Sequence, residues 1–223
     1  MPTIPLYVSC AASREILVFS LDPEAGHLTL RQRQALPGAG LPLKLSADRS
    51  LLLAGTRDAD ALHTFAVAPD DGTLRPIGQV ASPGAPTYVG LTPQRDLAFV
   101  ASYRDNLLAA FPLAADGTPG TACQVLRDLP RAHAAVCSAD GRWLLVPTLG
   151  ADAIRSYASV ATSAAPLTPA VPPTVEVRLG SGPRHLVFAA DGRQAYCLND
   201  LDNSLDAFDF DPACGRLALR QSL

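Results

Sequence analysis

The sequence predicts an all-β fold, a β-propeller built from four-stranded antiparallel blades. Its apolar residues alternate or run in blocks of four or five, which is the pattern of strands and not of helices. A series of strand, tight turn, strand, polar loop and strand occurs four times. The turns of these copies lie 46, 46 and 51 residues apart, at Asp48, Gln94, Asp140 and Asp191. These spacings match the roughly 40–50 residues of one propeller blade.

The best-formed copy spans residues 180–210. We expect its strands at 185–189, 194–198 and 204–210, with a tight turn around Asp191 and a polar loop at 199–203. The fourth, outer strand of each unit follows a second kind of turn, at 22–26, 69–72, 115–117 and 211–215. These turns combine Asp, which bonds its own backbone, with Gly, which supplies a positive φ.

Two stretches depart from this pattern. The first unit offers strands at 6–9, 16–21 and 28–32 but lacks an innermost strand. Residues 158–173 are rich in Ala, Ser and Pro, and we expect them to form an extended, mobile outer edge that lengthens the last spacing. Trp143 lies within a predicted strand, where we expect it to be part of the core.

We therefore predict one domain over residues 1–223, with blade units at about 1–36, 37–80, 81–126, 127–178 and 179–223. About five blades are present, and nothing in the sequence closes the ring. The expected shape is an open arc whose terminal strands have unpaired edges, and such edges favour self-association.

Composition excludes several classes of protein. The chain is 48% hydrophobic and 17% charged, with a net charge of −3, so a sizeable core is expected and nucleic acid is not an expected partner. Its five cysteines form no CxxC pair and its four histidines show no metal-ligand spacing, so we expect free thiols, no metal and no cofactor. Neither a signal sequence nor an apolar run long enough for a membrane helix is seen, which favours the cytoplasm and no membrane partner.

Blade topology brings polar residues to one mouth of the central channel. The first two strands of a blade are antiparallel, so the start of the first and the end of the second lie on the same face. The residues at these positions are His133, Arg184 and His185, and Arg57, Tyr103, Arg104, Asn199 and Asp200. Together they predict a polar, net basic site on loops above a rigid scaffold.

Three segments carry a resemblance to a known family. They are GPRHLVFAADGRQAYCLND at 182–200, SADGRWLLVP at 138–147 and APDDGTL at 68–74. They resemble the lactonase family of seven-bladed β-propellers, in particular its bacterial 6-phosphogluconolactonases, which are similar to carboxy-muconate cyclases. Members are longer by about two blades, so this chain looks like their N-terminal five-sevenths.

The resemblance implies hydrolysis of a small anionic sugar lactone, typically 6-phosphogluconolactone to 6-phosphogluconate in the pentose phosphate pathway. It also implies that His133, Arg184 and Asp200 are catalytic. His133 would activate water as a general base, Arg184 would hold the anion or the oxyanion, and Asp200 would orient either one. A capping role for His133 and a salt bridge between Arg184 and Asp200 are the structural alternatives. The family usually has Glu where this chain has Asp200.

Four further residues are predicted to bind the substrate: Arg57, Arg104, His185 and Asn199. Arg57 and Arg104 could bind a phosphate, although a surface arginine is usually only solvated. His185 should point to the opposite face of its strand from Arg184, which favours a structural role. Two other functions stay open, an inactive propeller that serves as a binding scaffold and an enzyme that forms lactones as muconate cyclases do.

Overall fold

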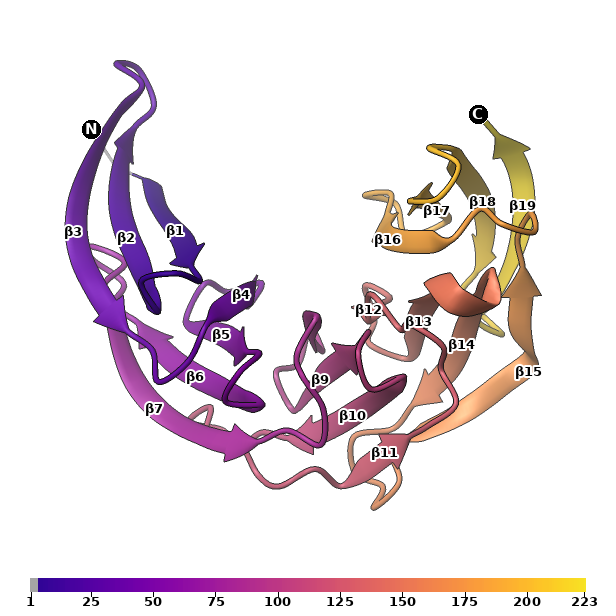
Figure 1. Ribbon diagram of the computed structural model, residues 1–223, viewed down its shortest axis with the longest axis horizontal. Coiled ribbons are helices and arrows are strands. Elements are labelled where there is room, and N and C mark those ends of the chain that lie inside the picture. The colour runs from indigo at the N-terminus through magenta and orange to yellow at the C-terminus, as the bar shows by residue number, and fades with distance from the viewer. Residues whose placement is uncertain (1–3) are drawn as a thin grey trace.

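The computed structural model describes residues 4–223 and confirms the all-β prediction. Five antiparallel sheets follow one another along the chain and stand around an open arc, with the two chain ends at its tips (Figure 1). The described residues contain one short 3₁₀ helix, η1 (Leu149–Ala151), and no helix long and apolar enough to cross a membrane. The architecture is that of consecutive propeller blades.

Each sheet is a simple meander whose first strand lies on the inner side of the arc (Figure 1). The first sheet has three strands, β1 (Ile4–Cys10), β2 (Glu15–Asp22) and β3 (His27–Ala35). The second contains β4 (Gly40–Leu45), β5 (Leu51–Thr56), β6 (Ala61–Val67) and β7 (Leu74–Ala81). The third contains β8 (Tyr88–Leu91), β9 (Leu97–Ser102), β10 (Leu107–Pro112) and β11 (Gln124–Leu126).

The fourth sheet contains β12 (Val136–Cys137), β13 (Trp143–Thr148), β14 (Ala153–Ser159) and β15 (Leu167–Glu176). The fifth contains β16 (Pro183–Phe188), β17 (Gln194–Asn199), β18 (Leu205–Asp211) and β19 (Arg216–Ser222). The order within each sheet follows the chain, so every neighbouring pair is a hairpin. Within residues 4–223 the first sheet has three strands where the others have four, as predicted for this unit.

Residues 158–173 were expected to form an extended and mobile outer edge of the fourth unit. The extended outer edge is confirmed, because residues 167–173 belong to β15, the outer strand of the fourth sheet. β14 continues to Ser159, and β15 pairs with it from Leu167, opposite Ser159, to Glu176, opposite Ala153. Because β15 is the outer edge of its sheet, its prolines need not donate to a further strand. Leu167 and Ala170 are buried, which anchors this proline-rich strand to the core.

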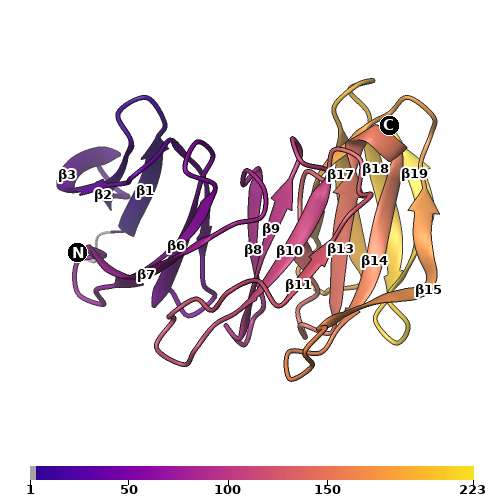
Figure 2. The same ribbon diagram turned by 60° about the horizontal axis from the view of Figure 1, so that its bottom comes forward.

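Apolar clusters between successive sheets form the core. Phe65 with Ile16 fills the space between the first and second sheets, and Phe111 with Leu62 that between the second and third. Phe99 with Leu144 packs the third sheet on the fourth, and Phe208 with Ile154 packs the fourth on the fifth. Figure 2 shows this last pair of sheets side by side. Face-to-face packing of this kind fixes the angle between blades.

The first and fifth sheets form the two ends of the arc, and neither packs on the other (Figure 1). Their outward faces carry apolar side chains that no other described sheet covers. They include Leu6 and Val8 on β1, and Val187, Leu198 and Leu219 on β16, β17 and β19. The described chain is therefore an open arc, as the sequence predicted.

Glutamine side chains join outer strands of neighbouring blades. Gln32 on β3 donates from Nε2 to the Leu74 carbonyl at 2.8 Å and accepts the Leu74 N–H at 2.6 Å. Gln124 on β11 makes the same two bonds to Leu167 at the start of β15, at 2.9 and 2.7 Å. A primary amide reproduces the hydrogen-bonding pattern of a peptide group, so each glutamine extends backbone pairing across a blade boundary.

Trp143 plays a comparable role between the fourth and fifth blades. It stands at the start of β13, partly buried, and its indole Nε1 donates to the Pro212 carbonyl at 2.9 Å. Gly215, with φ of 70°, lies against the indole ring so closely that a Cβ at position 215 would overlap it. Trp143 thus joins the two blades and also packs against the core cluster between their sheets, as predicted, although it stands at the start of its strand and not in the middle.

Replacement of Gln124 by alanine should destabilise the fold. The Gln124→Ala variant leaves the N–H and carbonyl of buried Leu167 without their partners, so we expect the free energy of unfolding to drop by about 1–3 kcal/mol. Urea denaturation followed by circular dichroism measures this loss. Gln79→Ala is the matched control, since Gln79 lies exposed on the outer strand β7. Equal stability of the two variants would show that the Gln124 contact contributes nothing.

Candidate active site

One cavity of about 410 Å³ opens at the mouth of the arc where polar residues were predicted to converge. Six residues of that predicted rim line it, and they come from four successive blades. The complete lining consists of Arg57, Ala85, Thr87, Tyr103, Arg104, His133, Leu149, Arg184 and Asp200. Its volume falls within the range of small-molecule sites.

His133 is held by its backbone in front of the short strand β12. Its N–H donates to the Pro147 carbonyl at 3.0 Å, and the preceding Ala132 forms an isolated bridge with Thr148. Ala132 and Ala134 are fully buried on either side of it. The Arg131 N–H donates to Asn106 Oδ1 at 2.7 Å. These contacts fix the backbone around His133, so its imidazole is held at the cavity wall.

The His133 imidazole accepts a hydrogen bond from Arg184. Arg184 Nε, which always carries a proton, lies 3.0 Å from His133 Nε2. His133 is therefore neutral, with its own proton on Nδ1, a buried atom that has no hydrogen-bond partner in the described part of the chain. Burial, then the Arg184 charge, then His185 lower its pKa to about 4. An imidazole whose Nε2 lone pair is already engaged does not suit the expected role of general base on water.

Arg184 continues this contact to Asp200. Its Nη1 lies 3.1 Å from Asp200 Oδ1, and both side chains are 43% exposed. The Asp200 N–H donates to the Gly182 carbonyl at 2.9 Å, which ties the start of the Asp200 loop to the start of β16. The result is a connected chain, His133–Arg184–Asp200, whose last member keeps its Oδ2 free of protein partners within residues 4–223.

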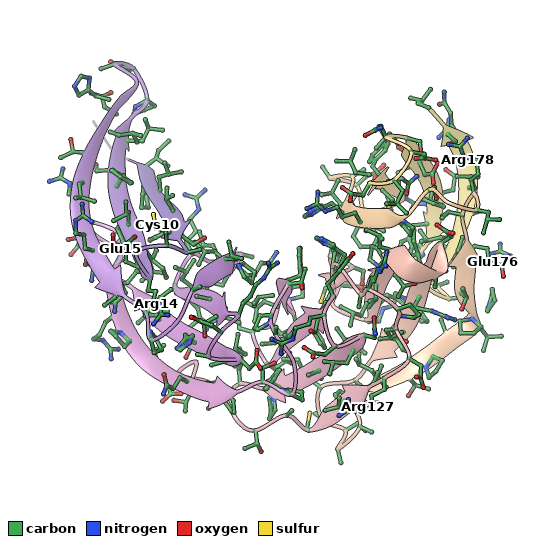
Figure 3. All side chains as sticks on the ribbon, in the orientation of Figure 1. Cys10, Arg14, Glu15, Arg127, Glu176 and Arg178 are labelled. Atoms are coloured by element: carbon green, nitrogen blue, oxygen red, sulfur yellow. The ribbon has the colours of Figure 1, made fainter. Side chains whose placement is uncertain are left out.

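The loop that carries Asp200 is fixed by its own network. Asp202 accepts a hydrogen bond from the Ser204 hydroxyl at 2.6 Å and forms an ion pair with Arg178, which lies beside the C-terminal sheet in Figure 3. The Ser204 hydrogen bond is the main reason why the pKa of Asp202 falls to about 2, and Arg178 adds to it. A loop fixed in this way keeps the backbone of Asp200 in place.

Asn199 and His185 do not line the cavity, although both were predicted to bind substrate. Asn199 is only 3% exposed, and its Nδ2 donates to Ser204 Oγ at 2.9 Å and to Asp206 Oδ2 at 2.8 Å. His185 is solvent-exposed and lies beside His133, with ring centroids 5.0 Å apart. Burial and Arg184 lower the pKa of His185. The placement of both residues fits support of the site and not contact with a ligand.

Four lining residues were not assigned a role from the sequence: Ala85, Thr87, Tyr103 and Leu149. Tyr103 meets the His133 ring edge to face at 5.9 Å, and the Arg131 guanidinium lies 5.7 Å from the Tyr103 ring centroid. The strand-end position of Tyr103 was visible in the sequence. Thr87 and Leu149 carry no chemical signal that could have singled them out.

Arg57 and Arg104 both line the cavity but differ in their partners. Arg104 Nη2 lies 2.9 Å from Asp60 Oδ2, and its Nε lies 3.1 Å from Asp105. Arg57 donates from Nε to the Pro86 carbonyl at 3.3 Å. Within residues 4–223 it forms no ion pair, and no group of three or more His, Cys, Asp or Glu side chains is placed to hold a metal ion.

Comparison with known proteins gives a consistent result. Residues 5–223 match the family model described as Lactonase, 7-bladed beta-propeller. A protein named 6-phosphogluconolactonase from Yersinia pestis is 34% identical over 218 residues, which are 98% of this chain and 64% of the relative. A Yersinia enterocolitica protein of the same name is 35% identical over 203 residues. The chain thus spans about 64% of the length of the Yersinia pestis relative.

Solved structures show the same fold. A Pseudomonas aeruginosa protein named as a periplasmic gluconolactonase superposes with a TM-score of 0.88 at 29% identity, covering 99% of this chain and 67% of that one. A Bacteroides fragilis protein gives a TM-score of 0.88 at 25% identity, with 100% and 67% covered. The open arc corresponds to about two thirds of these chains.

The hydrogen bond from Arg184 predicts how His133 titrates. We expect the His133 imidazole to stay neutral at pH 6, with its proton on Nδ1, and to titrate near pH 4. In Arg184→Met the pKa should rise, because a positive charge beside the ring is removed. Nuclear magnetic resonance titration of labelled histidines measures both values. An unchanged pKa in Arg184→Met would contradict the contact.

The same shift affects stability. The unfolded chain takes up a proton at His133 near pH 6.5, whereas the folded chain takes it up only near pH 4. Between these values the unfolded state binds more protons, so the contribution of His133 to the free energy of unfolding falls as the pH is lowered.

Proposed function

The chain belongs to the lactonase family of seven-bladed β-propellers, and on that premise we propose that it hydrolyses a sugar lactone, with 6-phosphogluconolactone as substrate and 6-phosphogluconate as product. The observation that carries this proposal is the His133–Arg184–Asp200 chain at the wall of a cavity lined by three arginines. An arginine-rich cavity suits an anionic substrate, and the relatives named 6-phosphogluconolactonase support the phosphorylated lactone.

Asp200 is the general base of the proposed reaction. It is the one carboxylate that lines the cavity, its side chain is 43% exposed, and Arg184 engages only its Oδ1. Asp200 Oδ2 takes a proton from a water molecule while the water oxygen forms a bond to the lactone carbonyl carbon. The carbonyl π electrons move to the carbonyl oxygen, which becomes an oxyanion.

Arg184 stabilises this oxyanion. Its Nε and Nη1 are engaged by His133 and Asp200, which leaves donors on Nη2 and the second Nη1 hydrogen for the developing charge. When the tetrahedral intermediate collapses, the bond from the carbonyl carbon to the ring oxygen breaks. The proton held by Asp200 then passes to that oxygen, so the ring opens to an acid and a hydroxyl without any other reactant.

His133 is a positioning residue in this scheme. It accepts from Arg184 Nε and thereby fixes the plane of the guanidinium, while its low pKa keeps it neutral and avoids a second positive charge beside Arg184. Tyr103 and His185 hold the imidazole from two sides. This assignment replaces the water-activating role that the sequence suggested for His133.

The proposed product places the reaction in carbohydrate metabolism, within the pentose phosphate pathway. All five cysteines are unpaired in the structure, which supports a reducing compartment such as the cytoplasm. One solved relative is named as a periplasmic enzyme, so fractionation of cells is the direct test of the compartment.

Removal of the proposed base or oxyanion donor should abolish most activity. We expect Asp200→Asn to lower kcat about 10²–10⁴-fold, because an amide cannot take the proton. Arg184→Met should lower it about 10²–10³-fold through loss of oxyanion stabilisation. A pH-stat assay of lactone opening, corrected for spontaneous hydrolysis, measures both.

Asp209→Asn is the matched control for Asp200→Asn, since Asp209 is an exposed carboxylate on β18 of the same sheet. It should retain full activity. Wild-type rates in purified Asp200→Asn and Arg184→Met proteins would refute the assigned roles, and a wild-type protein that opens no sugar lactone would refute the proposed function.

A further inference from the structure

The three arginines of the cavity differ in how far their charge is already neutralised. Arg104 contacts two carboxylates, Asp60 and Asp105, and Arg184 contacts one, Asp200. Arg57 contacts no carboxylate within residues 4–223, and its only side-chain hydrogen bond there goes from Nε to the Pro86 carbonyl. Both of its Nη groups are therefore without a protein acceptor in the described chain.

The carboxylates nearest to Arg57 in the chain are engaged elsewhere. Asp58 accepts from the Ala39 N–H at 2.6 Å and pairs with Arg14 at 3.1 Å; Figure 3 labels Arg14 at the end of the first blade's inner hairpin. Asp60 pairs with Arg104 across the blade boundary. Neither carboxylate is left to neutralise Arg57, whose side chain is exposed at the cavity wall.

Arg57 also stands apart from the proposed reacting groups. It follows β5 in the second sheet, whereas Arg184 and Asp200 belong to the fifth sheet, and the third and fourth sheets supply the wall between them. Arg57 and the pair Arg184–Asp200 therefore line the same cavity from different blades.

We propose that Arg57 is the specificity-determining residue for the phosphate carried on the exocyclic arm of the lactone. The proposal rests on the lactone hydrolysis proposed above. In a six-membered aldonolactone the sixth carbon is exocyclic on the fifth, and five bonds through the ring oxygen separate the carbonyl carbon from the phosphorus of a 6-phosphate, so the phosphate can meet an arginine other than the one that contacts the carbonyl. The free Nη groups present a planar pair of donors, which matches two phosphate oxygens better than a point charge does.

Arg57 contacts a part of the substrate that does not react. Its binding energy is thus available in the ground state and in the transition state alike, so its loss should appear mainly in KM. Arg104 is unsuited to the same task, because a phosphate would have to compete with Asp60 and Asp105 for its guanidinium. The phosphate therefore binds at the arginine whose charge no carboxylate neutralises, whatever the number of arginines in the cavity.

The test compares glucono-δ-lactone with and without a 6-phosphate as substrates of wild type, Arg57→Gln and Arg57→Lys. For Arg57→Gln we expect kcat/KM on the phosphorylated lactone to fall roughly 10- to 100-fold, mostly through KM, while that on the unphosphorylated lactone changes less than about twofold. Arg57→Lys keeps the charge without the paired donors and should be intermediate. Arg75→Gln removes an exposed arginine from the outer strand β7 and controls for net charge.

Retained activity on the unphosphorylated lactone shows that a variant is folded. Equal losses on both lactones, or no loss on the phosphorylated one, would overturn the proposal. Calorimetric measurement of 6-phosphogluconate and gluconate binding tests the role of Arg57 independently of the proposed hydrolysis. If the wild type opens neither lactone, hydrolysis is refuted. The role of Arg57 then stands only if Arg57→Gln, and not Arg75→Gln, weakens 6-phosphogluconate binding; unchanged or absent binding overturns it.

Discussion

Face-to-face packing of successive sheets is the constraint on which the rest of this structure depends. A four-stranded sheet of this size has two faces, and the chain buries them by stacking Phe65, Phe99, Phe111 and Phe208 between neighbours. Glutamine side chains and Trp143 then join the blades at their outer edges. Because every blade repeats the same meander, this packing also places the same strand ends of every blade at one mouth.

The chemistry of the cavity depends in turn on Arg184. One guanidinium contacts His133 on one side and Asp200 on the other. Burial and the Arg184 charge lower the pKa of His133, and the hydrogen bond from Arg184 engages the Nε2 lone pair, while the contact to Asp200 leaves one carboxylate oxygen free within residues 4–223. This arrangement underlies the proposed roles, in which His133 positions Arg184 and Asp200 accepts the proton.

Neutralisation decides the roles of the remaining arginines in the same way. Arg104 belongs to one blade and Asp60 to the preceding one, so their ion pair both joins blades and consumes a charge. Arg57 lacks such a partner because Asp58 and Asp60 are already engaged. The ion pairs that join the blades and the candidate site therefore use the same set of charged side chains. An arginine that forms no ion pair within the scaffold is available to bind a ligand.

The sequence alone determined the strands, the turns, the blade repeat and the six rim residues that meet at the cavity, since these follow from local alternation, turn chemistry and a regular spacing. It also indicated an extended outer edge within residues 158–173, but the pairing of this proline-rich segment with β14 and the burial of Leu167 and Ala170 depend on neighbouring strands. Only the tertiary structure decided the protonation of His133, the neutralisation of Arg104 and the inward turn of Asn199. The first two depend on partners 51 and 44 residues away in the chain, and no local pattern specifies such contacts.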